Sequence, residues 1–132
     1  MSEQQNRQVI EQAYQNFKTG DIQALLGQLT EDVSWQLAEM NNVPFAGKRQ
    51  GQAAVGEFFA TLADAQDVLK FEPQQFVAQG DKVVALGQYN WRVKATGREY
   101  GGDWAHVFTV RDGKIAGFQE YMDTASATDA FK

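Results

Sequence analysis

The spacing of the apolar residues changes part-way along the chain, and this change constrains the fold more than any other feature. As far as about residue 65, most apolar side chains recur every three or four positions, which places them on one face of a helix. From residue 68 onward they tend to alternate with polar side chains, as in strands with one buried face. Helices followed by hairpin-connected strands predict an α+β fold, with the helices packed on one face of a curved sheet.

Three helices are expected in the first half, at about residues 4–18, 22–29 and 51–65. Gly20 is a plausible C-terminal stop for the first helix, and Asp21 can cap the second. Residues 33–37 alternate in polarity and predict a short strand, and residues 38–50 are expected to form a loop.

Four strands are expected in the second half. Pro73 lies within the first of them and confines it to a sheet edge or interrupts it, because proline has no backbone N–H. Asp112-Gly113 is a strong hairpin-turn pattern. The expected strands are residues 68–78, 82–95, 100–111 and 114–123. Residues 124–132 are expected to be a short helix or a frayed end, and residues 1–132 a single domain.

Composition excludes several classes of site. The 132 residues include no Cys and one His, which excludes disulfides, thiolate catalysis, cysteine zinc sites and multi-histidine metal sites. The net charge of −5, without a basic run, argues against nucleic-acid binding. The polar start and the short apolar runs predict a cytoplasmic protein that does not bind membranes. Nine Phe, four Tyr and three Trp predict a ring-lined core or cavity.

Three segments resemble SnoaL-like proteins of the nuclear-transport-factor-2-like (NTF2-like), ketosteroid-isomerase-related superfamily. Residues 17–25, with Gly20-Asp21, resemble the link between the first two helices. Residues 106–115 resemble the penultimate hairpin, and residues 118–124 the last strand. The resemblance extends over about residues 8–125. It implies a cone in which three helices pack on a highly curved, mixed and mostly antiparallel sheet and enclose a pocket.

The resemblance does not extend to the catalytic groups of a ketosteroid isomerase. The position of its carboxylate base looks like Leu37, and that of its oxyanion tyrosine looks like Ala13, with Tyr14 one residue away. Its second oxyanion donor, a protonated aspartate, corresponds to His106. We therefore do not expect steroid isomerisation by that triad, although the cavity can persist.

His106 is the first candidate catalytic residue. It shares a strand face with Trp104 and Phe108, so it points inward if those rings are buried. Imidazole titrates near neutral pH and can accept or donate a proton in an enclosed pocket. The alternative is a structural histidine held by a backbone carbonyl.

Glu120 is the second candidate catalytic residue. It shares a face with Phe118 and Met122 on the last strand, where a carboxylate is costly to bury unless it is paired. Because the last two strands are neighbours in the family, Glu120 is expected near His106, where it would orient the ring. A structural salt bridge or a solvated strand end is the alternative role for Glu120. Asp123 is an alternative acid, although an exposed or structural role fits it better.

Rings and apolar side chains are expected to form the pocket wall. Tyrosine hydroxyls and indole N–H groups there could bind a ligand oxygen. For Tyr14, the favoured interpretation is a ring in the core with its hydroxyl at the rim. The expected ligand-binding residues are Tyr14, Trp35, Leu37, Phe59, Tyr89, Trp91, Tyr100, Trp104, Phe108, Phe118 and Met122.

These features predict a cofactor-independent acid–base enzyme, of isomerase, dehydratase or cyclase type, that acts on a small hydrophobic or aromatic/carbonyl molecule. His106 would be the general acid and base, and Glu120 would orient it. The alternatives are a non-catalytic module that binds a small hydrophobic molecule and a dimeric interaction protein. The resemblance implies a homodimer formed through the sheet. Polar residues at positions 88, 90, 92 and 94 on the expected outer face favour a hydrated interface.

Overall fold

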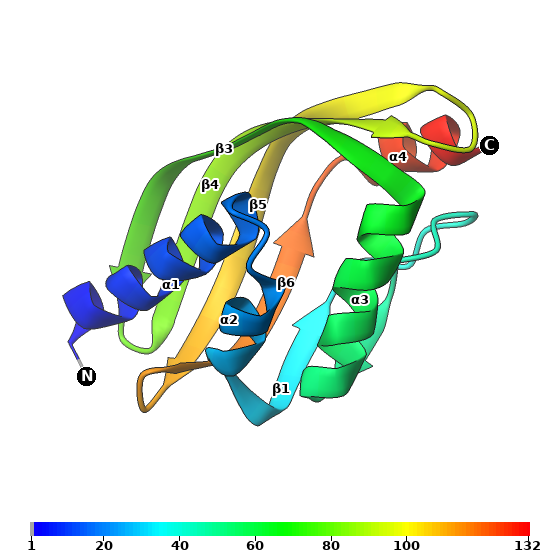
Figure 1. Ribbon diagram of the computed structural model, residues 1–132. Helices are drawn as coiled ribbons and strands as arrows, with labels where there is room; N and C mark the ends of the chain where they lie inside the picture. Colours follow the sequence, from blue (N-terminus) through cyan, green and yellow to red (C-terminus); the bar gives the residue numbers. More distant parts are fainter. Residues whose placement is uncertain (1) are drawn as a thin grey trace.

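The computed structural model describes residues 2–132 and consists of one curved sheet with helices packed under its concave side (Figure 1). The helices are α1 (Glu3–Lys18), α2 (Ile22–Gly27), α3 (Gln52–Ala65) and α4 (Thr124–Phe131). The strands are β1 (Leu29–Gln36), β2 (Lys48–Gln50), β3 (Gln66–Gln79), β4 (Lys82–Val93), β5 (Glu99–Arg111) and β6 (Lys114–Tyr121). The α+β architecture expected from the change in spacing is confirmed.

The sheet is mixed, open and mostly antiparallel. Its strand order is β2-β1-β6-β5-β4-β3, and only the β1–β6 pair is parallel. Pro73 therefore lies in an edge strand, as its missing N–H predicts, and the register of β3 shifts between Pro73 and Gln75. The long strands β4 and β5 pair with each other between β6 and the edge strand β3.

Local sequence explains where the first helices begin and end. Ser2 forms a capping box with Gln5 at the start of α1. Gly20 follows α1 with a φ of 78°, a conformation that glycine adopts at little cost. The Asp21 side chain then accepts a hydrogen bond from the Ala24 N–H and caps α2.

Gly87 lets the sheet close tightly around a tryptophan. A Cβ at this position would meet the Glu72 carbonyl oxygen and would lie 2.5 Å from Cζ2 of Trp104. The absence of a side chain therefore allows the Trp104 ring to lie directly against the β4 backbone.

Three features differ from the sequence-based prediction or extend it. β1 begins at Leu29 rather than 33, because Leu29 pairs with Ile115 of β6. The expected loop at 38–50 ends in strand β2, which pairs with β1 from Ser34 to Gln36. The chain end forms α4, capped by Asp123. Within residues 2–132, no helix has the length and apolar composition that crossing a membrane requires.

Candidate functional site

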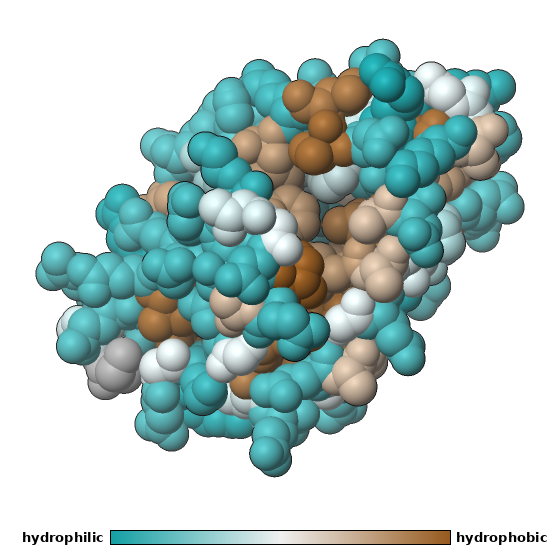
Figure 2. Space-filling view, in the orientation of Figure 1, coloured by the Kyte–Doolittle hydropathy of each residue, from teal (hydrophilic) through white to brown (hydrophobic). Residues whose placement is uncertain are grey.

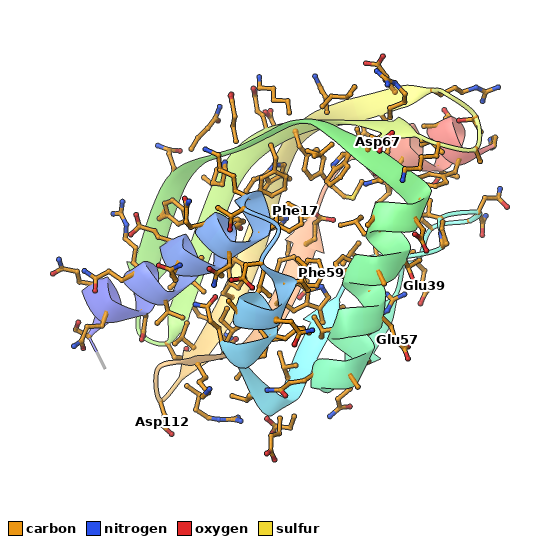
Figure 3. All side chains as sticks on the ribbon, in the orientation of Figure 1. Phe17, Glu39, Glu57, Phe59, Asp67 and Asp112 are labelled. Atoms are coloured by element: carbon orange, nitrogen blue, oxygen red, sulfur yellow. The ribbon has the colours of Figure 1, made fainter. Side chains whose placement is uncertain are left out.

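A cavity of about 80 Å³ lies between the sheet and the helices, and its wall is largely aromatic. Figure 2 shows apolar residues at the bottom of a hollow between α1 and α3. At this opening, Phe17 of α1 and Phe59 of α3 approach each other, with ring centroids 5.9 Å apart (Figure 3). The expected residues that line the cavity are Tyr14, Trp35, Leu37, Phe59, Tyr89, Trp91, Tyr100, His106, Phe108, Phe118, Glu120 and Met122.

His106 and Glu120 form a buried pair in this cavity. They are direct cross-strand partners on β5 and β6, so their side chains leave the same face of the sheet. His106 Nε2 lies 2.7 Å from Glu120 Oε2, and the two side chains are 5% and 10% exposed. The expected proximity of the two residues is confirmed, whereas their role stays a prediction.

Tyr14 completes a second hydrogen bond to the same ring. Its hydroxyl lies 2.6 Å from His106 Nδ1, so Tyr14 is not a core ring with its hydroxyl at the rim. Burial, and next the charge of Glu120, raise the pKa of Tyr14 well above its usual value, which keeps the phenol neutral. A neutral phenol donates to Nδ1, and the proton on Nε2 is then donated to Glu120.

Tyr89 binds the same carboxylate oxygen as His106. Its hydroxyl donates to Glu120 Oε2 at 3.3 Å and lies 3.4 Å from the sulfur of Met122. Burial, and next the charge of Glu120, raise the pKa of Tyr89. Tyr14, His106, Glu120 and Tyr89 therefore form one continuous hydrogen-bonded chain, which we call the proton chain.

Two tryptophans differ in their relation to the cavity. Trp35 lines it and stacks on Phe118 with ring centroids 4.1 Å apart. Trp104 does not line it, contrary to expectation, because its ring stacks on His106 at 4.0 Å and packs against Gly87 instead. Within residues 2–132, the buried Nε1 of Trp35 has no hydrogen-bond partner.

Residues 10–118 match the family model of the SnoaL-like domain, which is more than half of the chain. The protein belongs to the SnoaL-like family. It is similar to the crystal structure of an NTF2-like protein from Burkholderia xenovorans LB400, with 33% identity and a TM-score of 0.90. That alignment covers 100% of this chain and 99% of the other.

Two further solved structures share this fold. TerC, co-crystallised with polyporic acid, is 27% identical over 96% of this chain and 98% of its own, with a TM-score of 0.80. A protein from Mesorhizobium loti, described as a SnoaL-like polyketide cyclase, is 20% identical over 87% of this chain and 97% of its own, with a TM-score of 0.73. No curated protein matches the sequence.

The cavity wall carries few charged groups. Of the described residues that line it, Glu120 is the one acid and none is Lys or Arg. A carboxylate ligand would therefore enter an apolar space beside a negative charge without a cation to pair with. Leu37 and Ala13, at the positions of the ketosteroid isomerase base and tyrosine, contribute only apolar surface.

Gln66 is a polar lining residue that sequence reasoning missed. It is 3% exposed, and its Oε1 accepts a 2.6 Å hydrogen bond from the Tyr100 hydroxyl. Gln66 caps α3 and pairs with Val93 of β4, so its burial results from a distant strand pairing. No local pattern marks such a position.

Asp123, the alternative acid, lies outside the cavity wall. It is exposed and caps α4, where its carboxylate accepts hydrogen bonds from the Ser126 hydroxyl and N–H. These bonds hold the pKa of Asp123 below its usual value. Its role in the structure is to stabilise a helix end.

Proposed function

We propose that this SnoaL-like protein is a cofactor-independent acid–base enzyme that moves a proton on a small, uncharged carbonyl or aromatic molecule. Isomerisation, dehydration and cyclisation all contain such a step. The observation that carries the proposal is the proton chain, which is buried and lies against an apolar cavity. The TerC structure, obtained with polyporic acid, supports a small-molecule ligand for this fold.

The proton chain suggests how a proton is taken from a ligand without rearranging the site. A carbon next to a ligand carbonyl gives its proton to the Tyr14 hydroxyl oxygen, while the Tyr14 hydroxyl proton passes to His106 Nδ1. The phenol is neutral before and after, the ligand becomes an enolate, and the imidazolium formed is stabilised by Glu120. The reverse transfer delivers the proton to another atom of the ligand.

Trp35 is the candidate donor to the enolate oxygen. A buried N–H without a partner is unfavourable by about 1–3 kcal/mol, and such groups are rare in proteins. Two indole N–H groups, those of Trp35 and Trp104, are buried without a partner within residues 2–132, and of the two only Trp35 lines the cavity. A ligand oxygen at this N–H would acquire negative charge in a site with little water, where a preset donor is most effective.

Hydrogen–deuterium exchange of 2-tetralone, an enolisable bicyclic ketone, tests the proposal. NMR should show that the protein accelerates exchange at the carbons beside the carbonyl. His106→Ala should lower the rate by about 10²–10⁴-fold, the usual contribution of a general acid–base group. Near-UV circular dichroism checks that the variant is folded. An exchange rate that His106→Ala leaves unchanged would rule out the mechanism.

A non-catalytic binding module is the second candidate function. The observation that favours it is that both ring nitrogens of His106 are already hydrogen-bonded within the protein. A passive cavity predicts that the affinity for 2-tetralone varies little between pH 5 and 8. A working proton chain predicts a change within this range, because binding at the chain is coupled to the gain or loss of a proton. Isothermal titration calorimetry distinguishes the two.

We also propose that a second copy of the chain covers part of the outer sheet face. Positions 88 to 94 are polar there, as expected, but two cross-strand rows nearer the β3–β4 turn are uncharged and mostly apolar. The rows are Val77, Val84 and Val107, and Leu86, Ala105 and Tyr121, of which Val77 and Tyr121 are 57% and 53% exposed. A neutral patch can meet its own copy without charge repulsion.

Light scattering coupled to gel filtration tests this dimer. The natural chain should have twice the 14.7 kDa monomer mass, and Tyr121→Glu should shift it to the monomer. Asn90→Asp, in the polar part of the same face, is the matched control and should remain dimeric. A natural chain that elutes as a monomer would contradict the proposal.

A further inference from the structure

Gln66 and Tyr100 form a second polar group in the cavity, separate from the proton chain. Gln66 lies where α3 passes into β3, immediately before Asp67, which Figure 3 labels. Tyr100 lies near the start of β5, six positions before His106. The pair therefore meets the cavity at a different point of the wall from His106. It is still close enough that, besides burial, the charge of Glu120 helps to raise the pKa of Tyr100, so one ligand can reach both groups.

The hydrogen bond between the two residues determines which amide atom is free. Burial is the main cause that raises the pKa of Tyr100, so its phenol keeps its proton and donates to Gln66 Oε1. The amide Nε2 then has no hydrogen-bond partner among the described residues, although Gln66 is 3% exposed and lines the cavity. The N–H groups of Nε2 are therefore free to donate to a group that enters the cavity.

A hydrogen bond that served only to hold the end of α3 against β5 would not need a free amide donor. That bond uses only Oε1, and a structural glutamine usually satisfies its second amide atom with a backbone carbonyl. Gln28 shows that use in this protein, because its Oε1 accepts from Asn16 and its Nε2 donates to the Val9 carbonyl at 3.1 Å. Gln52 of α3 likewise gives its Nε2 to the Leu29 carbonyl at 2.8 Å. Gln66 keeps its corresponding donor on the cavity side.

We propose that Gln66 is a specificity-determining residue whose Nε2 donates to a second oxygen of the ligand, remote from the carbonyl that reacts at the proton chain. Tyr100 is a positioning residue that holds the amide with its N–H groups toward the ligand. The ligand is then bifunctional, with one reacting carbonyl and one neutral hydroxyl or carbonyl at the other end. The assignment of the reacting end rests on the proposed function, whereas the binding role of Gln66 does not.

Two matched ketones test the proposal by direct binding. The probes are 2-tetralone and 6-hydroxy-2-tetralone, which differ by one oxygen on the far ring, and calorimetry measures the affinity of each. The natural protein should bind the hydroxy ketone more tightly. Gln66→Met keeps the length of the side chain but removes the donor, and should reduce this preference about 3- to 10-fold, the range for one neutral hydrogen bond.

Two further variants separate specificity from folding. Gln52→Met makes the same chemical change outside the cavity and should keep the natural preference. Tyr100→Phe retains the amide but releases it, and should reduce the preference by less than Gln66→Met does. If Gln66→Met fails to fold, Tyr100→Phe still tests the inference through the same ratio.

The outcomes are distinguishable from those of the proposed function. A preference that depends on Gln66, without any deuterium exchange, would support the binding role and refute only the chemistry. Equal affinity of the natural protein for the two ketones, including binding of neither, would overturn the inference. A preference that neither Gln66→Met nor Tyr100→Phe reduces would overturn it as well.

Discussion

Alkaline pH should unfold this protein steeply, because three of its four tyrosines are held neutral inside it. Burial is the first cause that raises the pKa of Tyr14, Tyr89 and Tyr100. In the unfolded chain a tyrosine ionises with a pKa of about 10. Above that pH the unfolded state releases protons that the native state keeps, so the free energy of unfolding falls as pH rises.

The expected slope follows from the number of buried phenols. Each contributes about 1.4 kcal/mol per pH unit once the unfolded chain is fully ionised, so three contribute about 4 kcal/mol per unit. Between pH 10.5 and 11.5 this loss is a large part of the 5–15 kcal/mol that is typical of a whole domain. Tyr89→Phe removes one of the three groups and should lower the slope by about one third.

Urea unfolding at several pH values between 9 and 11.5, followed by tryptophan fluorescence, measures this slope. Absorbance at 295 nm counts ionised tyrosines in parallel. Three of the four should ionise only together with the loss of near-UV circular dichroism. Ionisation of all four in a protein that keeps its native spectrum would refute the reasoning, as would an equal slope in Tyr89→Phe.

Three further changes have clear expected outcomes. Gly87→Ala should lower the free energy of unfolding by about 1–3 kcal/mol, because its Cβ would meet Trp104, whereas Gly117→Ala on the outer face should cost less; urea titration compares them. Asp123→Ala should lower the melting temperature at pH 7 by removing the cap of α4. Hydrogen bonds lower the pKa of Asp123 in the folded protein. The stabilisation by its carboxylate is therefore complete above the usual pKa of an aspartate, and it should vanish as the pH falls through the lowered pKa of the folded state. Tyr14→Phe should slow 2-tetralone exchange at least 10-fold if the hydroxyl relays the proton, and an unchanged rate would exclude the relay.

Much of the proton chain was predictable from sequence because it depends on strand parity. His106 and Glu120 lie on strands joined by a tight Asp112-Gly113 turn. Alternation determines which side chains share a face, and the family resemblance places the last two strands side by side. The turn does not by itself set the exact pairing. A regular ladder from the turn would place His106 opposite Gln119, and the register shift between Thr109 and Val110 brings Glu120 there instead.

Other parts of the site required the packed structure. The Tyr14 hydroxyl reaches His106 because α1 crosses the concave side of the sheet over β5. The apolar pattern of α1 predicts which face of the helix is buried, but not the angle and position at which the helix crosses the sheet. Trp104 satisfies the same parity rule as His106, yet it packs against Gly87 and leaves the cavity wall. Gln66 is buried by pairing with Val93.

The sequence by itself determined the order of helices and strands apart from β2 and α4, restricted the strand with Pro73 to a sheet edge or an interruption, and set the inward direction of His106 and Glu120. These follow from periodicity, from the missing N–H of proline and from short turns, all of which act between near neighbours in the chain. Only the tertiary structure decided that Tyr14, Tyr89 and Gln66 present their polar atoms to the cavity. Each of these contacts joins residues separated by more than 25 positions, so it depends on how the helices and strands pack together.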